Sequence, residues 1–141
     1  MRSNLRMIIA GGGTGGHFFP AQTLKNSLIK KGVEVQYIGS QHGIESALLN
    51  ENDKNTTLLN IRGIQRHFNI QSILINCLFP LRFLDSYIKS RKIIRDFKPH
   101  VVIGTGGYSS GLPLLVAIHK GIKTVIHEQN SFPGIITRKL I

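Results

Sequence analysis

The chain has 141 residues, 41% of them hydrophobic, which is enough for one folded domain with its own core. The formal net charge of +11 favours anionic partners, namely nucleic acid, phosphorylated ligands or an anionic membrane face. Cys77 is the only cysteine, which excludes an internal disulfide. The sequence has neither a convincing signal peptide nor an apolar run of about 18 residues, the length needed to span a bilayer. We therefore expect a cytoplasmic protein, soluble or peripheral.

The first element is a short apolar run at residues 5–10, which predicts a strand. It ends in a loop with five glycines within six residues, followed by His17 and Pro20. Pro20 suits the first turn of a helix, and apolar residues then recur at helical spacing until Gly32 ends the pattern. A glycine loop in front of a helix N-terminus offers backbone N–H groups to phosphate or another anion. We therefore interpret this stretch as a ligand site rather than an ordinary tight turn.

The later elements alternate between strand and helix. We expect further strands at residues 33–38, 56–61, 100–103 and 123–127, and helices at residues 44–49, 70–97 with an interruption at Pro80, 112–120 and 134–141. A second glycine-rich loop, residues 104–111, follows the fourth strand. This alternation predicts an α/β fold, a Rossmann-like doubly wound parallel sheet of order 3-2-1-4-5. Strands 1 and 4, which both end in glycine loops, then lie side by side at the switch point where ligands bind.

The two glycine loops in one crevice suggest a ligand with a diphosphate, or two phosphorylated ligands. Gly11, Gly13 and Gly16 satisfy the dinucleotide fingerprint, but the second strand lacks the acidic residue that binds a ribose. Neither loop has the Gly-Lys-Ser/Thr of a P-loop, and there is no Cys/His cluster or Asp-x-Asp pair. We accordingly expect no cofactor and no metal.

Polar side chains accompany the glycine loops. A neutral His17 imidazole in the first turn of the helix could act as a general base on a hydroxyl, or could cap the helix. His127, Glu128, Gln129 and Asn130 follow the fifth strand near the same crevice, which favours a site. Glu128 could instead satisfy backbone groups structurally.

Residues 62–98 are basic and apolar, with eight Lys and Arg against Asp85 and Asp96. Leu81, Leu84 and Ile88 share one helical face, and Phe79, Phe83 and Tyr87 share another. One face can pack on the sheet. The second apolar-aromatic face, beside Arg82, is typical of an interfacial membrane patch. The alternative is that both faces are core and the cations form a solvated rim.

The three motifs together resemble the N-terminal domain of the MurG family of glycosyltransferases. They are the first glycine loop with His17, the second one with Tyr108, and residues 127–130 followed by Pro133 and Gly134. The resemblance covers the whole chain. It implies the N-terminal half of a GT-B glycosyltransferase, with residues 1–141 as an acceptor-binding domain that is incomplete at its C-terminal end and a UDP-GlcNAc-binding C-terminal domain that is absent.

The resemblance also implies a reaction: inverting transfer of GlcNAc from UDP-GlcNAc to lipid I, the undecaprenyl-diphosphate-linked muramoyl-pentapeptide, to form lipid II in peptidoglycan synthesis. His17 matches the candidate general base. The residues that match donor or diphosphate contacts are Thr14, Gly15, Gly16 and Asn130. Those that match acceptor contacts are Gly106, Gly107, Tyr108, Ser109, Ser110, His127 and Glu128. Phe79, Arg82 and Phe83 match a patch that docks peripherally on the anionic cytoplasmic face of the bacterial cell membrane.

Two other interpretations compete with an enzyme half. The chain could be a non-catalytic acceptor-binding and membrane-anchoring subunit of a two-chain glycosyltransferase. Charge alone suggests a nucleic-acid-binding domain, but the interleaved aromatic and basic strands of single-strand binders are missing, so we expect no nucleic-acid partner. In every case we expect this chain by itself to be catalytically inactive.

Overall fold

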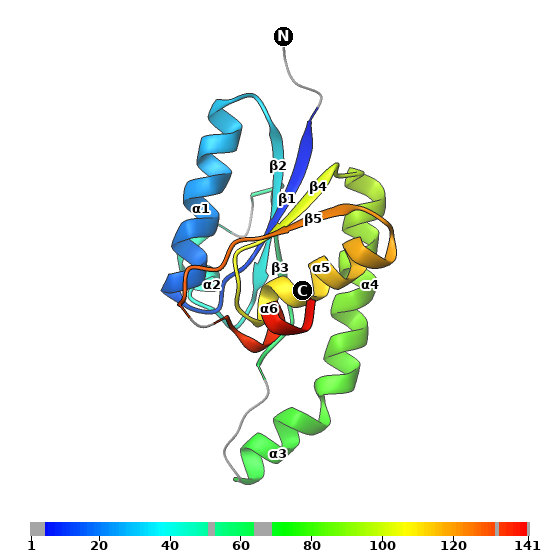
Figure 1. Cartoon of the computed structure of the whole chain (residues 1–141). Helices are drawn as coiled ribbons and strands as arrows, with labels where there is room; N and C mark the ends of the chain where they lie inside the picture. The colour runs from blue at the N-terminus through cyan, green and yellow to red at the C-terminus, as the bar shows by residue number, and fades with distance from the viewer. Residues whose placement is uncertain (1–4, 51–52, 64–68, 132, 141) are drawn as a thin grey trace.

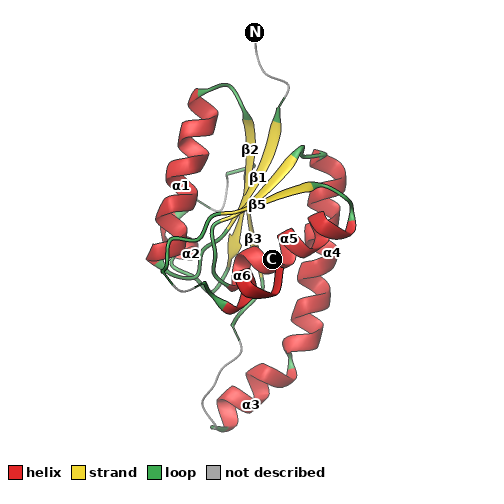
Figure 2. Ribbon diagram, viewed as in Figure 1, coloured by secondary structure: helices red, strands yellow, loops and turns green. Residues whose placement is uncertain are grey.

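Five parallel strands form one sheet at the centre of the molecule (Figures 1 and 2). The computed structural model describes residues 5–50, 53–63, 69–131 and 133–140. The strands are β1 Arg6–Ala10, β2 Glu34–Ser40, β3 Thr56–Leu59, β4 Val101–Gly104 and β5 Lys123–Ile126. Their spatial order is β3-β2-β1-β4-β5, so the doubly wound order predicted from the sequence is confirmed. The register pairs Ala10 at the end of β1 with Gly104 at the end of β4.

The helices of the described residues cover both faces of the sheet. They are α1 Gly15–Lys30, α2 Glu45–Leu48, α3 Ile70–Cys77, α4 Phe79–Phe97, α5 Tyr108–His119 and α6 Ile135–Leu140. Helix α1 lies on one face, and α4 and α5 lie on the other, while α3 extends away from the sheet (Figure 1). This is the layer arrangement that right-handed β-α-β crossovers produce.

The strand residues alternate between two buried clusters. Ile9 packs with Phe18 and Ala21 under α1. Ile8 and Ala10, which lie two residues apart on β1, belong to the cluster that includes Leu114 of α5. All six side chains are at most 3% exposed. A central strand buried on both faces explains why residues 7–10 are a continuous apolar run rather than an alternating one.

The two helices after the glycine loops begin earlier than the sequence predicts. Helix α1 starts at Gly15, so Pro20 is its sixth residue rather than a first-turn residue. Helix α5 starts at Tyr108 instead of residue 112, and Pro113 is again its sixth residue. Both glycine loops are therefore short, and their last residues belong to helices. At the sixth position each proline removes one i→i−4 hydrogen bond, to the carbonyl of Gly16 in α1 and of Ser109 in α5.

The long helix predicted at residues 70–97 is interrupted at Leu78, not at Pro80. Pro80 is the second residue of α4, where its missing N–H has no helical acceptor to lose. The two faces of α4 are also exchanged relative to the expectation. Ser86, Ser90 and Ile94 are the buried residues of α4, and the aromatic side chains lie on this same side.

The face of α4 expected to pack on the sheet faces outward instead. Leu81, Leu84 and Ile88 are 66%, 55% and 57% exposed. The aromatic residues form a ladder, with ring centroids 5.9 Å apart for Phe79 and Phe83 and 6.5 Å apart for Phe83 and Tyr87. The alternative that both faces are core is therefore wrong. Small serines on the aromatic side allow α4 to approach α5 closely, which decides the orientation.

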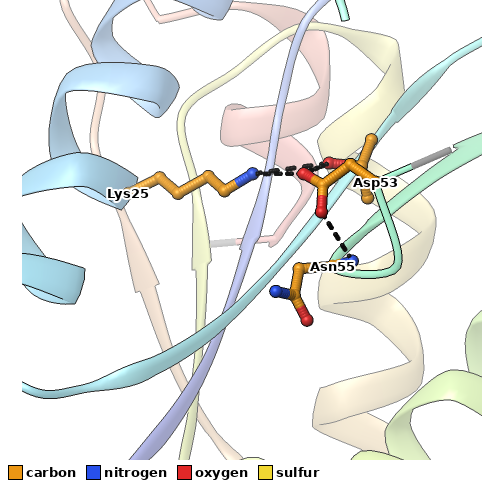
Figure 3. A network of polar contacts seen from close by, with 4 residues as sticks. Lys25, Asp53 and Asn55 are labelled. Atoms are coloured by element: carbon orange, nitrogen blue, oxygen red, sulfur yellow. Dashed lines mark hydrogen bonds and ion pairs between the residues drawn. The ribbon is translucent and has the colours of Figure 1, made fainter. Parts of the chain in front are cut away.

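A polar network joins α1 to the turn before β3 (Figure 3). Nζ of Lys25 lies 3.1 Å from Oδ2 of Asp53, which also accepts the hydroxyl of Thr56 at 2.8 Å. The Asn55 N–H donates to the other carboxylate oxygen at 3.0 Å. The pKa of Asp53 is lowered, first by the Asn55 N–H and then by the Thr56 hydroxyl and Lys25. The network fixes α1 against the β2–β3 side of the sheet.

A buried carboxylate anchors the first glycine loop. Glu45 has no exposed surface, and its Oε1 and Oε2 accept the Gly13 N–H at 3.1 and 2.9 Å. Oε1 also accepts the Ser40 N–H at 2.7 Å. The Tyr37 hydroxyl donates to the Gly11 carbonyl beside it. Burial, and secondly the charge of Glu45, raise the pKa of Tyr37, so its hydroxyl remains a donor.

We expect Glu45→Gln to destabilise the fold. The amide has one acceptor oxygen in place of two, and its NH₂ group would face backbone N–H donors. Hydrogen bonds to charged groups contribute about 1.5–3 kcal/mol, so we expect a loss of that order in the free energy of unfolding. Urea unfolding followed by circular dichroism measures it. Glu34→Gln, at an exposed carboxylate, is the control and should change little; equal stabilities of the two variants would contradict the anchoring role.

Candidate functional site

The two glycine loops touch each other at the carboxyl ends of β1 and β4. Gly106 and Gly107 have φ of +95° and +77°. A Cβ on Gly107 would lie 2.3 Å from the Gly12 carbonyl oxygen, and one on Gly106 would lie 2.5 Å from Nδ1 of His17. Glycine is thus required at both positions by backbone conformation and by the close approach of the first loop. The sequence prediction that the two loops lie together is confirmed.

His17 lies in the first turn of α1 and faces the second loop. Its Nδ1 is 3.1 Å from the backbone oxygen of Thr105. Because a carbonyl oxygen can only accept, Nδ1 carries the hydrogen, and in a neutral ring Nε2 then carries the lone pair. The Thr105 hydroxyl donates to the His17 carbonyl at 2.9 Å, so two hydrogen bonds join these residues. Thr105 is buried, whereas His17 is half-buried and accessible.

The backbone N–H groups that are free to bind an anion belong to the starts of α1 and α5, and not to the whole first glycine loop. The Gly13 N–H is occupied by Glu45, which corrects the expectation that this loop offers its N–H groups to phosphate. The first N–H groups of α1 and α5 have no acceptor within their own helices. Thr14, the N-cap of α1, makes no side-chain capping bond, and Gly107, the N-cap of α5, has no side chain. Both helix starts therefore present unpaired positive dipole ends at the crevice.

Gln129 reaches across to the first loop from the end of β5. Its Nε2 donates to the Gly16 carbonyl at 2.6 Å and to the Thr105 carbonyl at 3.0 Å. The structure thus brings the segment at residues 127–130 against His17, as the sequence predicts. His127 itself is exposed, and together with Thr105 it lines a hollow of about 490 Å³ beside α1.

Glu128 uses both carboxylate oxygens within its own loop. Oε1 accepts the Asn130 side-chain amide at 2.9 Å and its backbone N–H at 3.2 Å. Oε2 accepts the Thr137 hydroxyl at 2.9 Å and the Gly134 N–H at 3.2 Å. These contacts favour the structural alternative for Glu128. They also fix the amide of Asn130, whose nitrogen is engaged and whose Oδ1 accepts no hydrogen bond from the described residues.

The electrostatics of Glu128 follow from these contacts. Burial, the largest influence, raises its pKa, but the Thr137 hydroxyl, the Gly134 N–H and both nitrogens of Asn130 together outweigh it. The net effect is a pKa lowered to about 2. The carboxylate is therefore ionised throughout the physiological range.

The residues that open α5 divide into accessible and buried ones. The ring of Tyr108 lies against Gly13 and Gly63 and is half-buried. Ser109 and Ser110, which the resemblance predicts as acceptor contacts, are 0% and 1% exposed, so their side chains are buried in this structure. The Ser110 hydroxyl donates to the Gly107 carbonyl at 2.9 Å.

An apolar groove of about 530 Å³ lies beside Tyr108, between α4, α5 and α6. Its walls are mainly aliphatic and aromatic, with Arg62 and Lys139 as the charged residues, and they comprise Ile61, Arg62, Gly63, Phe79, Phe83, Tyr108, Gly111, Leu112, Leu115, Ile135, Ile136, Lys139 and Leu140. Phe79 and Phe83 of the predicted membrane patch therefore contribute to the groove, and Phe83 is 37% exposed. Arg82 is half-buried, and Arg66 lies outside the described residues.

Most of the exposed apolar surface lies on α3 and on the outward face of α4. The large apolar side chains there that are at least 45% exposed are Ile70, Ile73, Leu74, Leu78, Leu81, Leu84 and Ile88. None of the helices in the described ranges is both long and apolar enough to span a bilayer.

Sequence reasoning missed two residues that hold the site together. Glu45 was counted only as part of a short helix, and Thr105 only as part of the second loop. A buried acid has no local sequence signature, because its partners, Gly13 and Ser40, are brought together by the sheet. The one local signal is an acid in a chain with only 7 Asp and Glu against 18 Lys and Arg.

We expect the stabilisation from Glu128 to depend on pH. A carboxyl whose pKa is depressed in the folded state stabilises above its unfolded value near 4.5, and this stabilisation is lost as the pH falls toward about 2. Glu128→Gln should therefore lower the thermal midpoint at pH 7, and the difference from the native chain should shrink between pH 4.5 and pH 2. A difference that stays constant over this range would show that the charge is irrelevant.

Comparison with known proteins places this site in a family. Residues 7–140 match the glycosyltransferase family 28 N-terminal domain. A UDP-N-acetylglucosamine–N-acetylmuramyl-(pentapeptide) pyrophosphoryl-undecaprenol N-acetylglucosamine transferase from Christiangramia forsetii is 42% identical over 142 residues, which cover 99% of this chain and 38% of that protein. The protein of the same name from Syntrophus aciditrophicus is 44% identical over 138 residues, covering 96% of this chain and 37% of its own length.

A solved structure agrees with the sequence relatives. The crystal structure of Acinetobacter baumannii MurG aligns with a TM-score of 0.77 at 26% identity, covering 96% of this chain and 38% of that one. This chain thus spans less than half the length of the proteins it matches. The five-stranded parallel sheet with helices on both faces is the fold of a GT-B half. The chain belongs to glycosyltransferase family 28, as an N-terminal domain of the MurG type.

Proposed function

We propose that this chain is the acceptor-binding half of an inverting N-acetylglucosaminyltransferase of peptidoglycan synthesis. The reaction moves GlcNAc from UDP-GlcNAc to the muramoyl 4-hydroxyl of lipid I, giving lipid II. The observation that carries the proposal is the hydrogen bond between Nδ1 of His17 and the Thr105 carbonyl, at the meeting point of both glycine loops. The names of the relatives supply the chemistry of donor and acceptor.

His17 is the general base of this proposal. The Thr105 carbonyl holds the Nδ1–H tautomer, so Nε2 can accept the proton of the attacking hydroxyl. As the hydroxyl oxygen bonds to the anomeric carbon, the bond from that carbon to the diphosphate breaks and UDP leaves. Attack on the face opposite the leaving group inverts the configuration.

Thr14, Gly15, Gly16 and Asn130 form the donor-facing edge. The side chains of Thr14 and Asn130 are exposed, and a Cβ on Gly16 would meet only Oγ1 of Thr14, at 4.0 Å. Glu128 holds the nitrogen of the Asn130 amide, so its oxygen is oriented to accept a hydrogen bond from a sugar hydroxyl or amide. The start of α1 supplies backbone N–H groups for a phosphate of UDP.

Gly106, Gly107 and Tyr108 form the acceptor-facing edge in this proposal, with His127 nearby. The start of α5 supplies donors for the acceptor diphosphate. The apolar groove beside Tyr108 suits the lipid portion next to that diphosphate, and Arg62 and Lys139 add positive charge at its walls. A cavity of this size is within the range of about 300–1,000 Å³ that is usual for ligand sites.

The outward patch on α3 and α4 is the proposed membrane contact. Leucines and isoleucines there can enter the interface, while the exposed Lys89, Arg91 and Lys92 meet anionic headgroups. Phe79, Arg82 and Phe83, between this patch and the groove, link the bilayer surface to the acceptor site. In this proposal the chain binds peripherally to the cytoplasmic face of the bacterial membrane.

The donor needs a second wall to react. In a GT-B arrangement the nucleotide lies between two domains, and holding both substrates in place contributes roughly 7–11 kcal/mol to lowering the barrier. Residues 1–141 alone should therefore be inactive and bind UDP-GlcNAc poorly. Activity that appears only when a separate donor-domain chain is added would favour the alternative of a two-chain enzyme.

We expect His17→Ala to lower kcat by about 10² to 10⁴ in a protein that joins this domain to a donor domain, with little effect on acceptor affinity. The loss follows from removing the proton acceptor while the anion-binding helix starts remain. A continuous UDP-release assay with a soluble lipid I analogue measures kcat and KM. His42→Ala, at an exposed histidine that bonds Asn60, is the control. Near-normal kcat in His17→Ala would leave His17 a structural residue.

We expect the chain to bind anionic vesicles in a salt-sensitive manner, because each basic residue near such a surface contributes on the order of 1 kcal/mol. Leu84→Ser should weaken binding more than Phe83→Ser, since Leu84 is 55% and Phe83 37% exposed. Arg82→Glu should weaken it as well. Co-sedimentation with vesicles of anionic and of neutral lipid measures the difference.

The matched control for vesicle binding is Ile29→Ser. Ile29 is 47% exposed but lies on α1, across the sheet from α4. The Ile29→Ser variant should bind vesicles as well as the native chain does. If Ile29→Ser and Leu84→Ser lose binding equally, the membrane contact is not confined to the patch on α3 and α4. Equal binding of the native chain to neutral and anionic vesicles would show that the contact has no electrostatic contribution.

A further inference from the structure

Pro20 creates a specific vacancy in the hydrogen bonding of α1. In a regular helix its N–H would donate to the carbonyl of Gly16, four residues earlier, but proline has no N–H. The carbonyl of Gly16 is adjacent to His17 in the chain. An unsatisfied group at this point would loosen the turn that carries the proposed base.

The side chain of Gln129 supplies the missing donor. Its Nε2 lies 2.6 Å from the Gly16 oxygen, the shortest side-chain contact of this segment, and 3.0 Å from the Thr105 oxygen. Two acceptors facing the same atom require it to be the NH₂ group, which has two hydrogens to give. One amide thus reaches from the segment after β5 to the first turn of α1 and to the second glycine loop.

The Thr105 oxygen is the shared point of this arrangement. It accepts from Gln129 and also from Nδ1 of His17, at 3.1 Å. Thr105 is buried, and its hydroxyl donates to the His17 carbonyl. The protein interior therefore fixes the position of Thr105. Gln129 holds the Thr105 carbonyl from the solvent side. The next residue, Asn130, belongs to the proposed donor edge, so its distance from His17 depends on this bridge.

We propose that Gln129 is a positioning residue for the transfer reaction, acting through the Gly16 and Thr105 carbonyls to hold His17 and Asn130 in register. The inference rests on the proposed function for its catalytic consequence, but the bridge itself does not. Glutamine has the donors and the length that the geometry needs. Leucine has the size without a donor, glutamate would bring a charge against two carbonyl oxygens, and lysine keeps a donor that can reach them.

The bridge is tested first in the 141-residue chain by NMR, without any substrate. Gln129→Leu should move the carbonyl ¹³C shifts of Gly16 and Thr105, and Gln129→Lys should move them less. Adding Pro20→Ala to Gln129→Leu gives the helix its own N–H donor, so the Gly16 shift should return toward the native value while the Thr105 shift should not. Unchanged carbonyl shifts in Gln129→Leu would overturn the bridge.

The positioning role is tested in a protein that joins this domain to its donor domain. Misplacement by about 1 Å can cost about 10²-fold in rate, so we expect Gln129→Leu to lower kcat by about 10- to 100-fold. KM for UDP-GlcNAc should change less than about threefold, Gln129→Lys should recover part of the loss, and Gln129→Glu should be the worst variant. Gln41→Leu, at another exposed glutamine whose amide bonds a backbone carbonyl, is the matched control.

The two measurements separate the possible failures. Moved carbonyl shifts with native kcat in Gln129→Leu would make the bridge structural only and overturn the positioning role. Equal losses in Gln129→Leu and Gln129→Lys would likewise show that donation is not what matters. If the native joined protein has no transferase activity, the proposed function fails and the positioning role fails with it, whereas the NMR result still decides the bridge.

Discussion

The contact between the two glycine loops is the constraint on which the rest of this structure depends. Gly107 approaches the Gly12 carbonyl, and Gly106 approaches the His17 ring, more closely than any side chain would allow. This contact is possible because β1 and β4 are hydrogen-bonded neighbours and end at the same level, with Ala10 opposite Gly104. The doubly wound order thus places the starts of α1 and α5 together, and with them two positive dipole ends.

Polar groups from outside the glycine motifs hold this contact in place. Glu45 and Tyr37 fix the first loop from the β2 side, and Thr105 and Gln129 fix His17 and its helix from the β4 and β5 side. Each side chain satisfies backbone groups that the tight loops leave without partners. The glycines therefore serve mainly for close approach, and the backbone N–H groups that we propose for anion binding are those of the helix starts. The Glu45 carboxylate can therefore hold the first glycine loop, because the proposed anion site is at the helix starts and not at the Gly13 N–H.

The long basic segment shows a second division of roles, between its two apolar faces. Ser86 and Ser90 let α4 pack closely on α5, and this turns the aromatic side chains toward the body of the protein and Leu81, Leu84 and Ile88 toward solvent. The aromatic face becomes a wall of the groove beside Tyr108, while the aliphatic face continues onto α3 as an outward patch. In the proposed function, the acceptor site and the membrane-facing surface share this one helix, which suits a substrate with a polar head and a lipid tail.

The sequence by itself determined the strand order, the adjacency of the glycine loops and the family, because apolar periodicity and glycine spacing are local properties that the sheet topology preserves. It also singled out His17 and residues 127–130. The tertiary structure alone decided where α1 and α5 begin, which face of α4 is buried, and that Gly13, Ser109 and Ser110 are occupied or buried. It alone revealed Glu45, Thr105 and the reach of Gln129. These features depend on contacts between residues up to 113 positions apart, and such pairings leave no periodic signal in the chain.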